Sequence, residues 1–293
     1  MIDPDLLQVV IPTRDRAEQL LPTLDALAEQ SESVTVVVVD QSETVDARVQ
    51  ERAGVRLLAD SGRGLSRARN TGWHGVHARW IAFLDDDCRP EPDWAARLLE
   101  AISRHPDVAA ISGHVADADA PSGDYLPVTP FHVEREAVLS GARLPPWHIG
   151  MGVFMAVRRD VIERLGGWDE RLGAGTSPFP SSEDMDFNYR LLRSGERAYV
   201  SPDIRLRHWQ WRAPEQLPAL FGGYMAGWSG FAMKQLRQGD VSGGVWLWSL
   251  GARDAARMLA SAVRRRSRLR LRVAATKLRG LASGTLRGLL SSW

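Results

Sequence analysis

The chain has 293 residues, of which 44% are hydrophobic and 25% charged, and its formal net charge is +1. This composition excludes a disordered or fibrous protein and is sufficient for a large hydrophobic core. The single cysteine, Cys88, excludes an intrachain disulfide and a CxxC metal site, and fits a reducing cytosol. Residues 1–7 are acidic and lack the apolar stretch of a secretory leader, so we expect a cytoplasmic protein.

Four apolar segments in the first ninety residues are predicted to be strands that end in polar residues. They are residues 8–12, 34–39, 55–58 and 81–84, and leucines at helical spacing follow the first of them. Strands rich in Val and Ile are typical of a parallel sheet covered by helices on both faces. Because ligands bind beyond the carboxyl ends of such strands, we expect Asp40, Gly64 and the acids after residue 84 to share one crevice.

Three consecutive carboxylates, Asp85, Asp86 and Asp87, follow the fourth predicted strand directly. Neighbouring carboxylates raise one another's pKa unless they share a positive charge, so the triplet favours a bound cation. Because the ligands are all oxygen, Mg²⁺ or Mn²⁺ fits best. The alternative is a solvated acidic turn.

Seven segments, in order, resemble the motifs of family 2 glycosyltransferases. They read VVIPTR at 9–14, VVDQS at 38–42, GLSRARNTG at 64–72, FLDDD at 83–87, GMGVFMAVRR at 150–159, GGWDE at 166–170 and SEDMD at 182–186. The resemblance covers roughly residues 7 to 210. It implies an α/β protein of the GT-A fold, with a Rossmann-like nucleotide-binding mixed or parallel sheet flanked by helices. It also implies a nucleotide-sugar donor, a divalent cation and inversion at the anomeric carbon.

The resemblance assigns donor-binding roles to the strand ends. Asp40 would accept a hydrogen bond from the base, which favours UDP or dTDP, and Arg69 would bind the diphosphate. Pro12, Thr13 and Arg14 would flank the base. As alternatives from the residues alone, Asp40 is a turn cap and Arg69 a surface charge on a helix.

The resemblance also gives the triplet separate duties around the cation. Asp87 would bind the metal, Asp85 would contact the ribose or help to hold the metal, and Asp86 would assist. His208 stands where many relatives place a further metal or phosphate contact, although a lone histidine is more often structural.

An acceptor hydroxyl needs a carboxylate to take its proton, and Asp184 matches the second acid of the family's Glu-Asp pair. The alternative is structural, because Ser181 and Asp184 read as a capping box at a helix start. Trp168, Asp169 and Glu183 are expected to shape the acceptor site, where an indole face stacks on a sugar ring and carboxylates bind its hydroxyls.

Residues 253–293 carry eleven Lys or Arg against one acid, Asp254, a local charge of +10 that leaves −9 for residues 1–252. One predicted helical stripe contains Leu271, Ala274, Ala275, Leu278, Leu281, Ala282, Thr285 and Leu289, and the cations, Lys277 among them, lie at its sides and back. A basic amphipathic helix favours an anionic membrane surface. The alternatives are packing on the protein itself or a second copy, and nucleic acid, for which no recognition motif is present.

We therefore expect a nucleotide-sugar-binding half at 1–115, an acceptor-binding half at 116–215, and a C-terminal helical, Trp-rich and basic extension at 216–293. The expected function is metal-dependent transfer of one sugar to a hydroxyl of a glycan, a lipid-linked molecule or a small molecule, in cell-envelope glycan or glycoconjugate synthesis. The expected location is the cytoplasm, with peripheral attachment to the inner face of the cell membrane. The alternatives are a non-catalytic nucleotide-sugar or glycan-binding module and a sugar nucleotidyltransferase.

Overall fold

The structure, a computed structural model, describes residues 2–118, 126, 128, 131–209 and 212–293. The chain divides into two compact units. The first contains the described residues up to 118 together with 128, 131–168 and 184–209, and the second contains 126, 169–183 and 212–293. Residues 169–183, which we expected in the acceptor half, thus group with the C-terminal helices.

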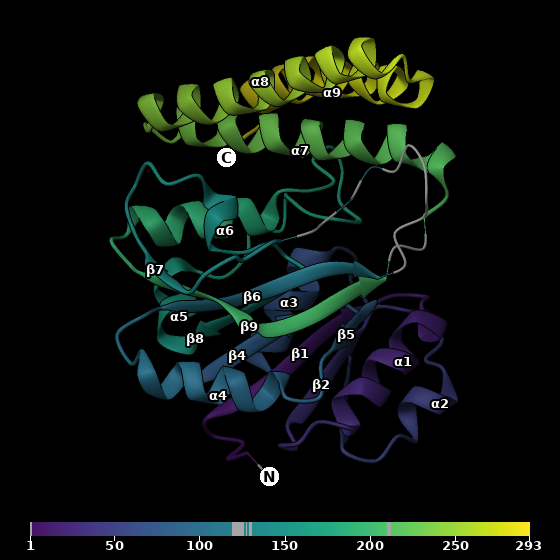
Figure 1. The fold of residues 1–293 in the computed structure, drawn as a ribbon, viewed down its shortest axis with the longest axis vertical. Coiled ribbons are helices and arrows are strands. Elements are labelled where there is room, and N and C mark those ends of the chain that lie inside the picture. Colours follow the sequence, from purple (N-terminus) through teal and green to yellow (C-terminus); the bar gives the residue numbers. More distant parts are fainter. Residues whose placement is uncertain (1, 119–125, 127, 129–130, 210–211) are drawn as a thin grey trace. The chain divides into compact units, whose positions relative to one another are not determined.

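The four expected N-terminal strands form the parallel part of a sheet in the first unit. They are β1 (Leu7–Thr13), β2 (Thr35–Asp40), β3 (Val55–Ala59) and β4 (Trp80–Leu84). The parallel pairs are β1 with β2, β1 with β4, and β2 with β3. Their connections contain α1 (Ala17–Ala28), the short α2 (Ala47–Gln50) and α3 (Leu65–His74) (Figure 1).

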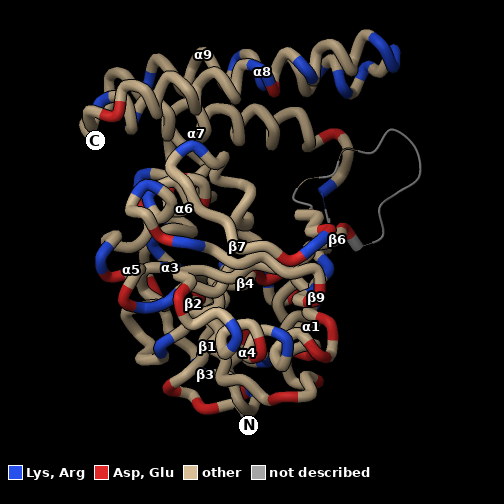
Figure 2. Tube along the Cα trace, turned by 60° about the vertical axis from the view of Figure 1, so that its left-hand side comes forward, with Lys and Arg blue, Asp and Glu red and all other residues tan. Residues whose placement is uncertain are grey.

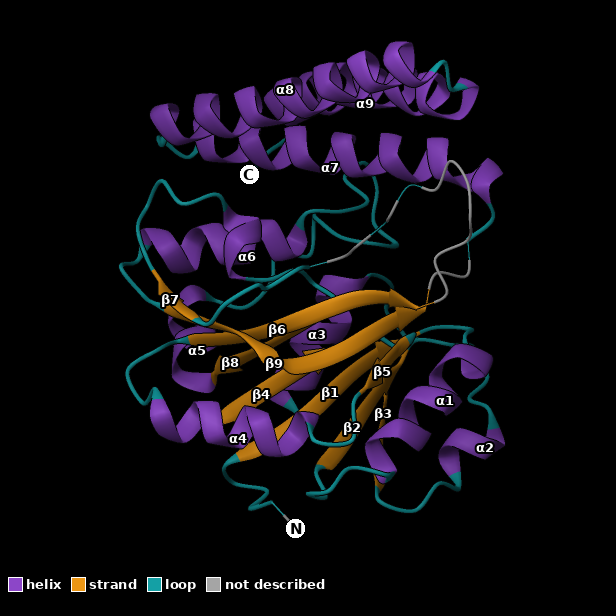
Figure 3. Cartoon of the chain, in the orientation of Figure 1, coloured by secondary structure: helices purple, strands orange, loops and turns teal. Residues whose placement is uncertain are grey.

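The later strands make the sheet mixed. They are β5 (Cys88–Pro90), β6 (Ala110–Ala118), β7 (Ala137–Leu139), β8 (Phe154–Arg158) and β9 (Ala198–Trp209). Among the described residues the strand order is β3-β2-β1-β4-β8-β6-β9-β5, and β7 pairs with β9 (Figure 3). β8 is antiparallel to both β4 and β6. The mixed sheet flanked by helices agrees with the expected fold class.

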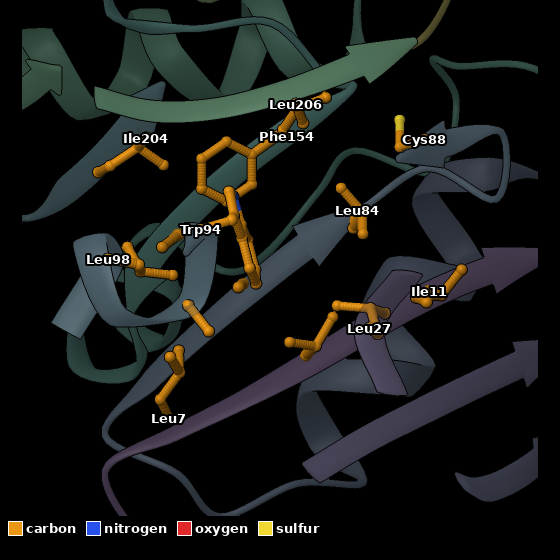
Figure 4. Close-up of a cluster of buried hydrophobic side chains, with 14 of the residues drawn as sticks. Leu7, Ile11, Leu27, Leu84, Cys88, Trp94, Leu98, Phe154, Ile204 and Leu206 are labelled. Atoms are coloured by element: carbon orange, nitrogen blue, oxygen red, sulfur yellow. The ribbon is translucent and has the colours of Figure 1, made fainter. Parts of the chain in front are cut away.

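Both faces of this sheet are buried, as the Val-rich strands predict. Val9 and Ile11 pack in one core with side chains of α1 and α4 (Trp94–Arg104), part of which is drawn in Figure 4. Val10 points to the other core, with side chains of α3, α5 (Arg159–Leu165) and α6 (Glu183–Arg193). This alternation along β1 follows from the two-residue period of a strand. A short 3₁₀ turn, Pro146–Ile149, precedes β8.

The second unit is built on three long helices, α7 (Leu217–Arg237), α8 (Val241–Arg265) and α9 (Arg268–Leu290), which follow the 3₁₀ turn Pro214–Gln216. Asp240 and Ser267 cap α8 and α9, because their side chains accept hydrogen bonds from the Gly243 and Arg270 amides. α8 and α9 lie side by side against α7 (Figure 1). No helix in the described part of the chain is both long and apolar enough to cross a membrane.

Glycines let α9 approach α7 closely. A Cβ atom at Gly280 would lie 2.2 Å from the Gly222 carbonyl oxygen, and one at Gly284 would lie 2.3 Å from the Ala226 carbonyl oxygen. This face of α9 also buries Ala274, Lys277 and Leu281.

The helical stripe that we predicted in the tail is therefore wrong in part. Ala274 and Leu281 pack inward, while Leu271, Leu278 and Leu289 are exposed. Lys277, expected at the side or back, is buried and its Nζ lies 2.6 Å from Asp254 Oδ2. The sequence pattern misled because it weighted Leu and Ala over Gly, whereas the close helix contact selects the smallest residues.

Candidate active site

The carboxyl ends of β1, β2 and β4 meet through their strand registers. Thr13, the last residue of β1, is in register with Asp40 of β2. Thr13 also donates from Oγ1 to Asp86 Oδ2 at 2.7 Å, just beyond the end of β4. On the other side of β4, the Asp85 amide donates to the Val153 carbonyl at 3.0 Å. The strand ends therefore gather the acidic triplet with residues from three distant segments.

The pairing of β5 with β9 brings His208 to the triplet. Cys88 and His208 are partners in this antiparallel pair, and the Trp209 amide donates to the Asp87 carbonyl at 2.8 Å. His208 Nε2 lies 3.3 Å from Asp87 Oδ1, and both side chains are buried. The structure thus places His208 in contact with the predicted metal ligand, 121 positions earlier in the chain.

Arg16 holds two of the three acids, a contact that we did not predict. Its Nη2 lies 2.6 Å from Asp87 Oδ2, and its Nη1 lies 3.1 Å from Asp86 Oδ1. Arg16 directly precedes α1, and the residue before it, Asp15, has a positive φ of 54°. Arg14, which is expected beside the base, has its Nε 3.3 Å from Asp15 Oδ2. The sequence shows arginines after the first strand, but the geometry of the turn decides which of them points toward the acids.

The buried charges shift one another's pKa values. Burial raises the pKa of Asp86 to about 7, although Arg16 and the Thr13 hydroxyl act against it. Burial would also raise the pKa of Asp87, but the hydrogen bonds and charges of His208 and Arg16 outweigh it and hold that pKa well below its usual range. Burial lowers the pKa of His208, and the Asp87 carboxylate overcomes this so that the imidazole pKa is raised. The pair of Asp87 and His208 is therefore held charged.

The donor chemistry around Asp87 suits a hard divalent cation, because Asp85 and Asp87 offer carboxylate oxygens and His208 an imidazole nitrogen. Among the described residues, however, no group of three or more His, Cys, Asp or Glu side chains is arranged to hold a metal ion. Arg16 supplies positive charge at Asp87 instead. The residue types thus suit Mn²⁺ or Mg²⁺, while in this structure Arg16 balances the negative charge of Asp87.

Arg69 connects the triplet to Asp184. Its Nη2 lies 3.3 Å from Asp85 Oδ1 and donates to the Gly152 carbonyl at 2.8 Å. The Gly152 amide in turn donates to Asp184 Oδ2 at 2.7 Å. Arg69 is 2% exposed, so these contacts fix it within the protein and exclude the surface-charge alternative. Asp85, Arg69, Gly152 and Asp184 therefore form one continuous set of contacts.

Asp184 lies in the first turn of α6, which begins at Glu183. Its Oδ1 accepts the Met185 amide at 2.8 Å, as an acid at a helix start does. Ser181, expected in a capping box, instead donates from Oγ to the Tyr224 carbonyl at 3.1 Å. Ser182 has a positive φ of 71°. A non-glycine residue in this conformation is strained, and such residues concentrate at functional sites.

The wall expected to hold the base is built on Asp40. Its Oδ1 accepts the Ser42 amide at 2.8 Å, which is the turn-capping contact of the structural alternative. Next to it lies a network that we did not predict. The side-chain Nε2 of Gln41 donates to Asp60 Oδ2 at 2.8 Å, and its Oε1 accepts from the backbone amide of Gly64 at 3.0 Å. Both side chains are buried. Gln41 was visible within a quoted motif, whereas Asp60 had no motif to mark it.

The three residues expected at the acceptor differ in their surroundings. The Trp168 ring is 3% exposed and stacks on Phe187 with ring centroids 4.5 Å apart. Asp169 Oδ2 lies 2.8 Å from Lys234 Nζ and 2.7 Å from Arg171 Nη2. Glu183 is also buried. The structure gives Trp168 a packing role and Asp169 an ion-pairing role, and their contacts with an acceptor stay predictions.

Comparison with known proteins finds relatives that are named as glycosyltransferases. The chain is 27% identical over 204 residues to glucosyl-dolichyl phosphate glucuronosyltransferase of Haloferax volcanii, covering 66% of this chain and 65% of the relative. It is 27% identical over 240 residues to N-acetylglucosaminyl-diphospho-decaprenol L-rhamnosyltransferase of Mycobacterium tuberculosis, covering 70% and 76%. The chain thus spans less than two thirds of the length of the first relative.

Two solved structures share the fold. The mannosyltransferase PcManGT from Pyrobaculum calidifontis, in complex with GDP-Man and Mn²⁺, superposes with a TM-score of 0.63 at 17% identity, covering 96% of this chain and 86% of the other. S. aureus TarS 1-349, in complex with UDP, has a TM-score of 0.57 at 16% identity, covering 76% and 65%. Such identities support a common fold and nothing finer.

The model of the family described as glycosyl transferase family 2 matches residues 8–166, more than half of the chain. The matched region includes β1 to β4, the acidic triplet, Arg69 and Gly152. The protein belongs to glycosyl transferase family 2 and has the GT-A fold.

Proposed function

We propose that this glycosyltransferase moves one sugar from a nucleoside-diphosphate sugar to a hydroxyl acceptor, with inversion at the anomeric carbon. The observation that carries the proposal is the contact set from Asp85 through Arg69 and Gly152 to Asp184. It puts a cation suited to a diphosphate next to a carboxylate suited to a hydroxyl proton. Neither a binding module nor a nucleotidyltransferase requires a catalytic base at the position of Asp184.

In the proposed reaction the acceptor oxygen attacks the anomeric carbon while the bond to the β-phosphate oxygen breaks. The acceptor proton passes to an Asp184 oxygen, and the bonding electrons leave with the nucleoside diphosphate. Arg69 stabilises the charge that develops on the departing phosphate, because its guanidinium fork matches phosphate oxygens. The Gly152 amide, which donates to Asp184 Oδ2, would hold this carboxylate in place for the transfer.

Asp87, Asp85 and His208 are the residues that would hold Mn²⁺ or Mg²⁺, with Asp86 assisting. A bound cation would neutralise charge on the diphosphate. To receive it, Asp87 would exchange the Arg16 guanidinium for the cation. The relative solved with GDP-Man and Mn²⁺ supports this dependence.

The base would lie against Asp40, with Pro12, Thr13 and Arg14 beside it. An acid accepts a hydrogen bond from the ring NH of uracil or thymine, which favours UDP or dTDP. Structural relatives were solved with UDP and with GDP-Man, so likeness alone leaves the base open.

The acceptor is a hydroxyl of a glycan, lipid-linked or small molecule, held by Trp168, Asp169 and Glu183. The names of two relatives, given above, contain dolichyl phosphate and diphospho-decaprenol. They support a lipid-linked acceptor in cell-envelope glycan or glycoconjugate synthesis. The enzyme would then work in the cytoplasm at the inner face of the membrane.

The test is hydrolysis of a panel of UDP, dTDP and GDP sugars, compared between wild type and Asp184→Asn. Loss of the base should lower turnover by about 10²- to 10⁴-fold while UDP binding persists. Asp203→Asn, at an exposed acid of the first unit, is the matched control and should behave as wild type. Full activity in Asp184→Asn would refute the assigned base, and no turnover of any donor by the wild type would refute the function.

A further inference from the structure

The outer faces of α8 and α9 are unusually apolar. Of twelve large hydrophobic side chains exposed among the described residues, ten belong to these two helices. Those of α8 are Val241, Val245, Trp248, Leu259 and Val263. Those of α9 are Leu271, Leu278, Leu286, Leu289 and Leu290. We call these ten residues the outer apolar stripe.

The stripe is narrow on each helix. At 3.6 residues per turn, the five α8 positions fall within about 60° of one another, and four of the five α9 positions within about 80°. The two halves also meet, because Trp248 Nε1 donates to Thr285 Oγ1, beside Leu286, at 2.9 Å. The stripes of the two helices therefore come together at Trp248 within the second unit, and we call them together the apolar band.

Arginines follow the band on both helices. On α9, Arg272 and Arg279 are exposed and each directly follows a stripe leucine. On α8, Arg253, Arg257 and Arg264 are also exposed, about 80° to 120° further round the helix than the stripe. In Figure 2 these two helices carry many blue segments and little red. The one tail acid, Asp254, and the buried Lys277 neutralise each other. Asp254 is the one acid of α8 and α9, so these helices contain no other acid that could balance their exposed arginines.

The inner face of α9 packs within the second unit. Gly280, Gly284 and Gly288 of α9 pack on α7. This face of the helix therefore accounts for the alternative that the tail packs on the protein itself. The leucines of the stripe on α9 are 41% to 78% exposed. They are thus the side available for another surface.

We propose that the outer apolar stripe and its arginines bind the surface of an anionic phospholipid membrane. Aliphatic side chains flanked by Arg suit the boundary between headgroups and acyl chains, where the apolar band is buried and the cations meet lipid phosphate. A second copy would bring two strongly positive surfaces together, whereas an anionic membrane supplies the opposite charge. Nucleic acid would leave the aliphatic band exposed.

Co-sedimentation of the full chain with vesicles tests this surface. The chain should bind phosphatidylcholine vesicles that contain phosphatidylglycerol, bind pure phosphatidylcholine much less, and be released partly by salt. Each arginine near such a surface contributes about fivefold in partitioning, so Arg272→Gln with Arg279→Gln should weaken binding about 25-fold. Leu278→Ser with Leu286→Ser should also weaken it.

The matched control is Arg104→Gln with Val138→Ser, an exposed arginine and an exposed valine of the first unit, which should bind as wild type. Circular dichroism and the melting temperature establish that each variant is folded. Absent binding of the wild type to anionic vesicles at low salt would overturn the proposal, as would binding by both double variants that is as tight as that of the wild type. A concentration-dependent dimer that the leucine variant abolishes, without vesicle binding, would assign the surface to a second copy. No donor or acceptor is present, so failure here and failure of the proposed transfer reaction are separate results.

Discussion

Gly152→Ala should damage catalysis far more than stability, because Gly152 lies between the two groups assigned to the reaction. A Cβ atom at this position would lie 3.0 Å from Arg69 Nη2 and 3.2 Å from Asp184 Oδ2. Both distances are tighter than ordinary contacts, so the side chains must separate by a few tenths of an ångström. Arg69 is 2% exposed and has no solvent to move into.

The expected magnitudes follow from this geometry. Overpacking costs about 1 to 3 kcal/mol, and the lower backbone entropy of unfolded Ala returns about 0.4 to 1 kcal/mol. The net loss of stability should therefore stay below about 3 kcal/mol. Because a misplacement of about 1 Å can cost 10²-fold in rate, turnover should fall by about tenfold or more.

The assay is nucleoside diphosphate release from the donor that the wild type uses, alongside urea denaturation. Gly223→Ala is the matched control, since a Cβ there would meet Pro180 Cγ at an ordinary 3.4 Å. The control should keep full activity and gain stability from the helix propensity of Ala. If Gly152→Ala turns over as fast as the wild type when equally folded, the link between Arg69 and Asp184 does not serve the reaction.

Three further perturbations probe the charges and the helices. Arg16→Met should lower stability by about 1 to 3 kcal/mol without metal, and Mn²⁺ should raise the melting temperature of this variant more than that of the wild type. Arg14→Met is the control. If Mn²⁺ raises the melting temperatures of Arg16→Met and the wild type equally, the competition between Arg16 and the cation is contradicted. Because the folded-state pKa of Asp86 is raised to about 7, the wild type loses stability as pH rises from about 4 to 7. Asp86→Asn should remove that loss, worth at most roughly 4 kcal/mol, in denaturation curves recorded in EDTA, and an unchanged pH slope would refute it. Gly284→Ala should lower the free energy of unfolding by about 1 to 3 kcal/mol, because the added Cβ atom separates α9 from α7. An unchanged free energy of unfolding would show that this helix contact is loose.

Much of the fold could be predicted because local pattern and global packing agree. The Val-rich runs at β1 and β2 are buried on both faces, and the polar residues after them do meet at one edge of the sheet. These features depend on residue type and on the general behaviour of parallel strands, so one sequence is sufficient.

The site could be predicted in its acids and less well in its cations. Asp85 to Asp87 stand out as a motif, but Arg16 takes the inward position because of the turn at Asp15, where φ is 54°. His208 reaches Asp87 only through the register of β5 with β9. Strand register over more than a hundred residues cannot be inferred from either segment alone.

The C-terminal helices show a different limit. Amphipathic counting treats Gly as neutral, so it groups the buried Ala274 and Leu281 with the exposed leucines in one predicted helical stripe and misses the glycines that pack. Burial is decided here by how closely two backbones approach, which hydrophobicity does not report. The grouping of residues 169–183 with these helices has the same origin, since Gly227 admits Ser181 and Gly230 admits Phe179.

The central claim is that the acidic triplet and Arg69 bind a nucleoside diphosphate with the help of a divalent cation. Isothermal titration of UDP, dTDP and GDP into the chain, with Mn²⁺ and with EDTA, tests it most directly. We predict that UDP or dTDP binds at least about tenfold more tightly with Mn²⁺, and that Asp87→Asn removes this difference. Binding that ignores both Mn²⁺ and Asp87, or no binding of any nucleoside diphosphate, would contradict the claim.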